Sequence, residues 1–117
     1  MNPVVHGIPN CDTVRKARAW LAAQGIAYRF HDLRREGVPA DRLDGWLAAP
    51  GWEALVNRKG TTWRQLDDAT RAGVIGTASA RALMLAHPSV IKRPVVDWDG
   101  ETTVGFDPAT WASRTAR

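Results

Sequence analysis

Cys11 is the only cysteine in the chain and the side chain best suited to nucleophilic chemistry. It stands between an apolar segment, residues 4–8, and a segment of helical periodicity that begins at about residue 12. A thiol at a helix N-terminus faces unpaired backbone N–H groups and the positive end of the helix dipole, and both stabilise the reactive thiolate. Arg15, one turn further along the same helical face, can add positive charge. The alternative is a buried structural cysteine, which the polar loop around Cys11 argues against.

The residue three places after the cysteine excludes one kind of redox chemistry. Position 14 is valine, so the chain lacks the second thiol of a C-x-x-C motif. Dithiol exchange within this loop is therefore impossible. A mixed disulfide on Cys11 needs an external thiol, such as glutathione, to resolve it.

Two further segments carry positive charge next to turn-forming residues. Arg93 precedes Pro94, and the planar guanidinium of an arginine can bind an anion through parallel hydrogen bonds. Pro94 is either an ordinary proline at a sheet edge or a cis-proline bend that presents backbone to a ligand. Arg58 lies in the basic loop 57–60 ahead of a short helix, which suits an anion site. Solvated surface charge is the alternative for both arginines.

The composition limits the class of protein. The 16 Lys and Arg against 12 Asp and Glu give a net charge of +4, but the basic residues are spread along the chain, which argues against nucleic acid as a partner. No apolar run reaches the roughly 18 residues of a membrane span. The N-terminus shows no secretion signal, so we expect a cytoplasmic protein. The three histidines lack metal-ligand spacing, and we expect no metal site. Most of the six tryptophans are expected to be packing residues.

Periodicity and turn residues predict the elements that position Cys11. The first strand, helix and second strand form a β-α-β unit, whose crossover makes the two strands parallel. Asp99-Gly100 indicates a hairpin turn between the last two strands. Thr61 or Thr62 is expected to cap the helix at 61–66. Predicted strands cover residues 4–8, 26–31, 95–98 and 102–105, and predicted helices cover 12–24, 40–49, 52–56, 61–66, 67–72, 77–86 and 108–113.

This order of elements predicts an α/β fold with a thioredoxin-like mixed sheet. The sheet is built from a β-α-β unit, a helical insert and a β-β-α unit. We expect the whole chain, residues 1–117, to form a single domain with the insert at about 39–87.

Three segments together resemble the arsenate reductase (ArsC) family of the thioredoxin-like superfamily. They are residues 7–17 around Cys11, residues 54–63 around Arg58, and residues 87–94, which end in Arg93-Pro94. The combination of Asn-Cys-Asp-Thr with Gly-Thr-Thr-Trp-Arg looks closest to the YffB-type branch. That branch is similar to the arsenate reductases but is thought to act as glutathione-dependent thiol reductases.

The resemblance implies roles for individual residues. Cys11 matches the family nucleophile, and Arg15 completes its C-x-x-x-R pattern. Arg93 matches an oxyanion-binding arginine and Pro94 matches the cis-proline of the fold. Arg58 falls one position beyond a further active-site arginine of the reductases. We expect Cys11, Arg15 and Arg93 to act in catalysis. The expected substrate-binding residues are Asn10, Asp12, Thr13, Arg58 and Pro94.

Two departures from the family pattern concern oxyanion capture. The reductases have a histidine four residues before the cysteine, where this chain has Gly7. His6 is one position early and should point to the other face of the strand. The reductases also carry an arginine after the last strand, where this chain reads Val104-Gly105-Phe106. Fewer positive donors weaken the capture of a compact oxyanion such as arsenate.

The resemblance and its departures together favour a glutathione-dependent thiol–disulfide oxidoreductase with Cys11 as its single nucleophile. Glutathione is then a co-substrate and no cofactor is expected to be bound. Glutaredoxin is a further candidate partner, and we expect a monomer. One alternative is an arsenate reductase coupled to glutaredoxin and glutathione. A second is a regulatory binding protein similar to Spx, although Val14 removes the C-x-x-C switch of that class.

Overall fold

The computed structural model describes residues 2–115, which fall into two compact units. Unit 1 contains the chain up to Asp32 and again from Arg93 onward, and unit 2 contains Leu33–Lys92. The predicted helical insert lies within the range of unit 2. Within residues 2–115, every helix is too short or too polar to cross a membrane.

Unit 1 contains a four-stranded sheet with the order β2-β1-β3-β4. Strand β1 (Val4–Gly7) pairs in parallel with β2 (Arg29–Asp32), which confirms the predicted crossover. It pairs antiparallel with β3 (Val95–Asp97), which forms a hairpin with β4 (Thr102–Val104). Gly100 occupies the hairpin turn with a φ of 87°, where a side chain would be strained. The prediction of a mixed, thioredoxin-like sheet is confirmed.

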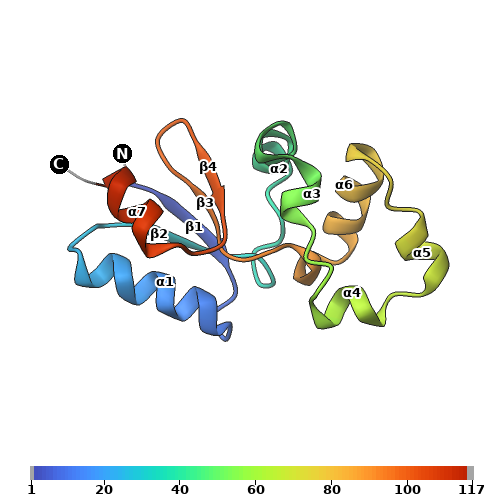
Figure 1. Cartoon of the computed structure of the whole chain (residues 1–117), viewed down its shortest axis with the longest axis horizontal. Helices are drawn as coiled ribbons and strands as arrows, with labels where there is room; N and C mark the ends of the chain where they lie inside the picture. Colours follow the sequence, from blue (N-terminus) through green and yellow to red (C-terminus); the bar gives the residue numbers. More distant parts are fainter. Residues whose placement is uncertain (1, 116–117) are drawn as a thin grey trace. The chain divides into compact units, whose positions relative to one another are not determined.

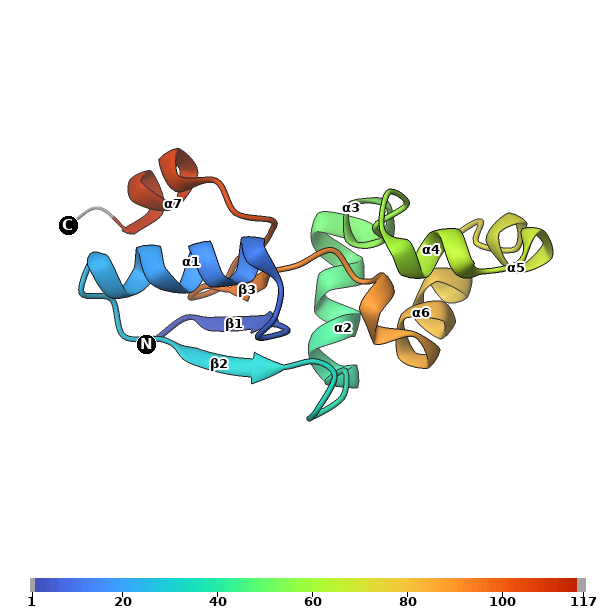
Figure 2. The same cartoon turned by 90° about the horizontal axis from the view of Figure 1, so that it is seen from below.

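Helices α1 (Asp12–Ala23) and α7 (Pro108–Thr115) cover the same face of this sheet (Figures 1 and 2). Ala17 and Leu21 recur at helical spacing on α1 and pack with Trp111 of α7 onto Val5 and Val96. The Trp111 side chain is only 1% exposed. Further aromatic rings meet Trp111 edge to face, with ring centroids 4.8–5.9 Å away; they belong to Trp20, Trp98 and Phe106. These tryptophans are packing residues, as expected.

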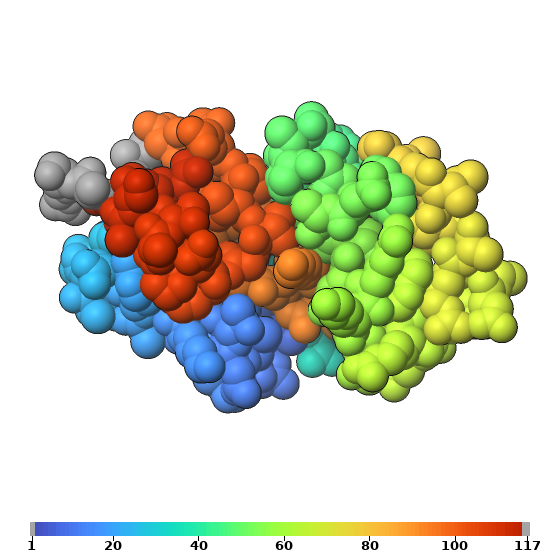
Figure 3. Space-filling model, viewed as in Figure 1, coloured from blue at the N-terminus to red at the C-terminus, as the bar shows by residue number. Residues whose placement is uncertain are grey.

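Unit 2 is helical. It contains α2 (Ala40–Trp46), a kinked segment (Leu47–Gly51), α3 (Trp52–Leu55), α4 (Thr61–Gln65), α5 (Asp68–Ala72), α6 (Thr77–Ala86) and a short 3₁₀ turn (Pro88–Val90). The largest helix, α6, contacts α3 and buries Leu83 and Met84. Helices α4 and α5 bury no residue completely, and Figure 3 shows their yellow-green and yellow atoms on the surface of this unit. The loop after α3 is tied to the segment after α6 because Asn57 N donates to Val90 O at 2.8 Å.

Three predicted boundaries are wrong, each for a physical reason. Strand β2 begins at Arg29 rather than residue 26, since its partner β1 begins at Val4, which pairs with Arg29. Helix α2 was predicted to run to Ala49, but Ala49 is extended (φ −160°, ψ 120°) because the following proline disfavours helical backbone. Helix α4 is preceded by Gly60 as its N-terminal cap residue, so neither Thr61 nor Thr62 caps it. The remaining boundaries lie within two residues of the prediction, and α6 begins and ends where it was predicted.

Candidate active site

Cys11 is the N-terminal cap residue of α1, and its side chain is half-buried. Its backbone is extended (φ −96°, ψ 126°), and its carbonyl accepts the first helical hydrogen bond from Arg15 N at 2.9 Å. The thiol makes no capping hydrogen bond, so no cap side chain satisfies the first amides of a twelve-residue helix. A group held against the sulfur would meet those donors and the positive end of the helix dipole.

The turn that leads to Cys11 is open to solvent. Pro9 and Asn10 are exposed, and Cys11 N donates to Ile8 O at 3.4 Å, which closes the turn. Thr13, in the first turn of α1, is also exposed. The structure thus leaves Asn10 and Thr13 accessible beside the thiol, while their contact with a substrate remains a prediction.

Arg15 and Asp12 form an ion pair on the first turn of α1. Nη1 of Arg15 donates to Oδ1 of Asp12 at 3.0 Å, and the side chains are 60% and 86% exposed. A pair this exposed contributes little to stability. It does change the field around Cys11, because the negative charge of Asp12 offsets the positive charge that Arg15 was predicted to supply. Sequence reasoning missed this pair, although a spacing of three residues is one at which helical side chains meet and could have shown it.

Gly7 and Val14 bring the end of β1 against the first turn of α1. A Cβ atom on Gly7 would lie only 2.8 Å from Cγ2 of Val14, which is closer than packed carbon atoms approach. Val14 is fully buried. Val14, which stands where a C-x-x-C motif has its second thiol, therefore also fills the space beside Gly7.

Arg93 and Pro94 lie at the end of the sheet from which the Cys11 turn departs. The register pairs His6 of β1 with Val95, the first residue of β3, so Arg93 and Pro94 enter β3 at the end of the sheet where β1 finishes at Gly7. The peptide bond between Arg93 and Pro94 is cis, and Pro94 is buried with its carbonyl accepting from Gly105 N at 2.8 Å. Arg93 is half-buried. The catalytic role of Arg93 and the substrate contact of Pro94 remain predictions.

The side chain of His6 is held inside the sheet by contacts with strand β3. Its side chain is fully buried, Nδ1 donates to Val95 O at 3.0 Å, and the same nitrogen lies 3.7 Å from Oδ2 of Asp97. The ring of His31 on the adjacent strand lies 5.1 Å away, centroid to centroid. Since Val5 packs under α1 and α7, alternation places His6 on the other face of the strand, as predicted.

Arg58 belongs to unit 2, in the loop between α3 and α4. Its side chain is exposed, and its Cζ lies 5.5 Å from the ring centroid of Trp52 and 5.8 Å from that of Trp63. Sequence reasoning missed these two aromatic contacts, because spacing alone does not show where a loop folds back on its flanking helices. A role for Arg58 in substrate binding remains a prediction.

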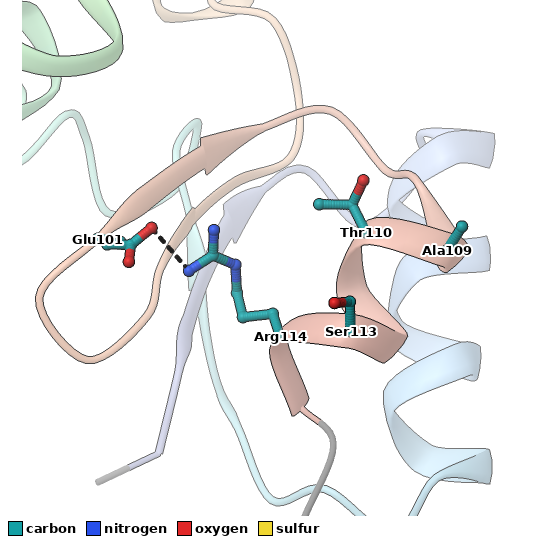
Figure 4. Close-up of a pocket in the computed structure, with 5 residues that line it drawn as sticks. All are labelled: Glu101, Ala109, Thr110, Ser113 and Arg114. Atoms are coloured by element: carbon teal, nitrogen blue, oxygen red, sulfur yellow. Dashed lines mark ion pairs between the residues drawn. The ribbon is translucent and has the colours of Figure 1, made fainter.

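A hollow in unit 1 involves none of the predicted site residues. It has a volume of about 650 Å³ and lies between the hairpin and α7, lined by Glu101, Ala109, Thr110, Ser113 and Arg114 (Figure 4). Arg114 reaches from α7 to Glu101, with Nη1 2.9 Å from Oε2, so the main charge in the hollow is already neutralised. Cys11 does not line this hollow. Because its one arginine is already paired with Glu101, we do not take the hollow as the active site.

Comparison with known proteins assigns the chain to a family. A model of the ArsC family matches residues 6–113. The chain belongs to the ArsC family. This family includes arsenate reductases. Within residues 2–115 of this ArsC protein, no three His, Cys, Asp or Glu side chains gather as metal ligands would.

Two solved structures and one curated relative resemble this ArsC protein over nearly their whole length. The YFFB protein is 46% identical, with a TM-score of 0.93 over 98% of this chain and all of its own. An arsenate reductase (ArsC) related protein from Brucella melitensis is 48% identical, with a TM-score of 0.76 over 100% of this chain and 97% of its own. An uncharacterized protein from Haemophilus influenzae is 40% identical over 88% of this chain and 90% of its own.

Proposed function

We propose that this ArsC protein is a glutathione-dependent thiol–disulfide oxidoreductase that uses Cys11 as its only nucleophile. The main support is the placement of one half-buried, uncapped thiol at the start of α1, with Val14 where a resolving thiol would stand. An isolated thiolate can open a disulfide but cannot release itself. The proposal therefore requires a small external thiol.

The reaction has two exchange steps. The Cys11 thiolate attacks the glutathione sulfur of a mixed disulfide R–S–S–G, which forms Cys11–S–S–G and releases the thiolate RS⁻. A second glutathione thiolate then attacks the glutathione sulfur on Cys11, which restores the Cys11 thiolate and releases glutathione disulfide. The net reaction is R–S–S–G plus one glutathione thiolate giving RS⁻ plus glutathione disulfide. The incoming glutathione sulfur is oxidised, the R sulfur is reduced to the thiolate, and RS⁻ takes up a proton from solvent. Reduced glutathione is plentiful in the cytoplasm, which we propose as the compartment.

Electrostatics favours thiol exchange over arsenate reduction. Arsenate is a compact anion whose capture needs several uncompensated positive donors. Here the nearest arginine along the helix, Arg15, is paired with Asp12 at 3.0 Å, and Asp12 adds a negative charge beside the nucleophile. The sulfur atoms of a disulfide are uncharged, so their approach to Cys11 does not need positive donors. Arsenate reduction is therefore the second candidate.

The proposal is tested by reducing a glutathione mixed disulfide with glutathione, comparing the wild type with Cys11→Ser. We expect turnover in the wild type, loss of at least about a hundredfold in Cys11→Ser, and a wild-type intermediate that carries one glutathione by intact mass. Thr13→Ser keeps a hydroxyl beside the thiol and serves as the matched control. Equal turnover in wild type and Cys11→Ser would reject the proposal. A parallel arm with arsenate, glutaredoxin and glutathione would favour the second candidate if it alone showed turnover.

A further inference from the structure

Arg58 is an exposed arginine that contacts two aromatic rings rather than hydrogen-bond acceptors or carboxylates. Its Cζ lies within 5.5 Å of the Trp52 ring and 5.8 Å of the Trp63 ring, close enough for cation–π attraction. Both tryptophans are half-buried, so each ring keeps some surface in contact with solvent. Within residues 2–115, the Arg58 guanidinium has no hydrogen-bond or ion-pair partner.

Other arginines of this protein are used differently. The side chain of Arg81 is paired with Asp44 at 2.7 Å in unit 2, and Arg71 is paired with Asp68. Arg64 is close to Arg58 in sequence, but its Nη2 donates to Lys59 O at 3.1 Å. Arg58 therefore combines a fixed position with an unused set of N–H donors.

The backbone that carries Arg58 is also held in place. Asn57 N donates to Val90 O at 2.8 Å, and Asn57 Oδ1 accepts from Lys59 N at 3.2 Å. A Cβ on Gly60 would lie 2.8 Å from Nδ2 of Asn57, so the loop closes tightly around that side chain. An arginine ordered before binding loses less side-chain entropy when a ligand arrives.

We propose that Arg58, Trp52 and Trp63 form a subsite for the carboxylate of a peptide, with the two tryptophans as positioning residues. The Cζ atom of Arg58 lies over both indole rings, and the guanidinium N–H donors take no acceptor within residues 2–115. They remain available to an acceptor with two coplanar oxygens, which a carboxylate provides. The exposed parts of the indoles offer apolar surface to the carbon skeleton next to that carboxylate. An inorganic oxyanion has no such skeleton and gains only the charge interaction.

This inference rests on the proposed function only where it names glutathione as a source of the carboxylate. The C-terminal carboxylate of a protein has the same chemistry and is the other source. The subsite is built entirely within unit 2 and does not use Cys11. Its test can therefore be separated from the test of thiol exchange.

The experiment is an NMR titration of the indole N–H and arginine Nε–H signals, performed on Cys11→Ser so that no exchange reaction occurs. The probes are S-methylglutathione, its diethyl ester, N-acetyl-diglycine and inorganic phosphate. We expect S-methylglutathione to shift the signals of Trp52, Trp63 and Arg58, and the ester and phosphate to bind at least about fivefold more weakly. N-acetyl-diglycine binding as tightly as S-methylglutathione would assign the subsite to C-terminal carboxylates in general, and weaker binding would assign it to glutathione.

Single substitutions distinguish residues that position the Arg58 guanidinium from residues that only stabilise the fold. Trp63→Ala should weaken S-methylglutathione binding roughly two- to fivefold, and Trp63→Phe should recover most of the loss because a ring face is restored. Arg58→Gln should abolish the selectivity for the free acid over the ester, whereas the matched control Arg64→Gln should keep it. Equal binding of acid and ester to the Cys11→Ser protein would overturn the inference even if thiol exchange were active. Selective binding of the acid would support it even if thiol exchange were absent.

Discussion

Gly7 lies so close to Val14 that a Cβ on the glycine would fall 2.8 Å from Cγ2 and 3.1 Å from Cγ1 of the valine. Strand β1 and the first turn of α1 therefore meet with no side chain from position 7 between them. Cys11 stands between these two residues in the chain, so their contact sets where the thiol sits relative to the sheet. It also means that a histidine at position 7 and a valine at position 14 could not coexist in this backbone.

We expect Gly7→Ala to displace the start of α1. The added methyl overlaps a fully buried valine, and overpacking of this kind costs about 1–3 kcal/mol of unfolding free energy. The same displacement should slow disulfide exchange at Cys11. Urea unfolding and the glutathione mixed-disulfide assay measure the two effects.

The control for this prediction is a second substitution that makes room. Val14→Ala alone leaves a cavity and should destabilise by about 2 kcal/mol. In the double variant Gly7→Ala, Val14→Ala, the new methyl enters that cavity, so exchange should recover toward the wild-type rate. If the double variant lost the sum of the two single losses, the contact would not position Cys11.

Asp12→Asn is expected to make Cys11 more reactive toward negatively charged disulfides. The substitution removes a negative charge beside the thiol and frees Arg15 from its ion pair. At low salt we expect the exchange rate with a dianionic aromatic disulfide to rise about threefold relative to that with neutral bis(hydroxyethyl) disulfide. Stopped-flow absorbance measures both rates.

The ratio of these two rates is the informative quantity, because any change in the thiolate fraction affects both disulfides alike. The ratio should approach the wild-type value in about 1 M salt, where exposed charges are screened. A ratio that stayed unchanged at low salt would show that the Asp12 charge does not act on the approaching disulfide.

Asp107 makes the stability of α7 dependent on pH. The pKa of its carboxyl is lowered because Thr110 Oγ1 donates to Oδ2 at 2.7 Å and Ala109 N donates to Oδ1 at 3.2 Å. A carboxyl with a lowered pKa in the folded state favours folding when ionised. Its contribution is present above the unfolded-state pKa of about 3.9 and is lost as the pH falls through the lower folded-state pKa.

We therefore expect the difference in stability between wild type and Asp107→Asn to be constant near neutral pH and to shrink below about pH 4. Urea unfolding at a series of pH values, followed by tryptophan fluorescence, measures it. Glu53→Gln, which removes an exposed carboxylate from unit 2 that has no ion pair within residues 2–115, controls for general charge effects. A difference that grew on acidification would contradict the role assigned to the ionised carboxylate.

Much of unit 1 could be predicted because its signals are local. Alternating residues and a helical repeat ending before Gly25 predicted β1, α1 and the parallel crossover, and Asp99-Gly100 predicted the hairpin. The start of strand β2 was misplaced by three residues, since Ile26 and Tyr28 alternate like a strand but have no partner on β1. They pack against the core as partly buried side chains instead.

In the candidate site, too, some features follow from the local sequence and others only from the tertiary structure. The sequence by itself determined that a single thiol stands at the start of a helix and that it has no resolving partner at position 14. These are consequences of residue type and of spacing within one helix. The tertiary structure alone decided that Val14 packs on Gly7, that His6 of β1 pairs with Val95 next to Pro94, and that Arg58 lies against Trp52 and Trp63. These relations depend on strand register, close packing and loop closure, which arise only when distant or oppositely oriented segments meet.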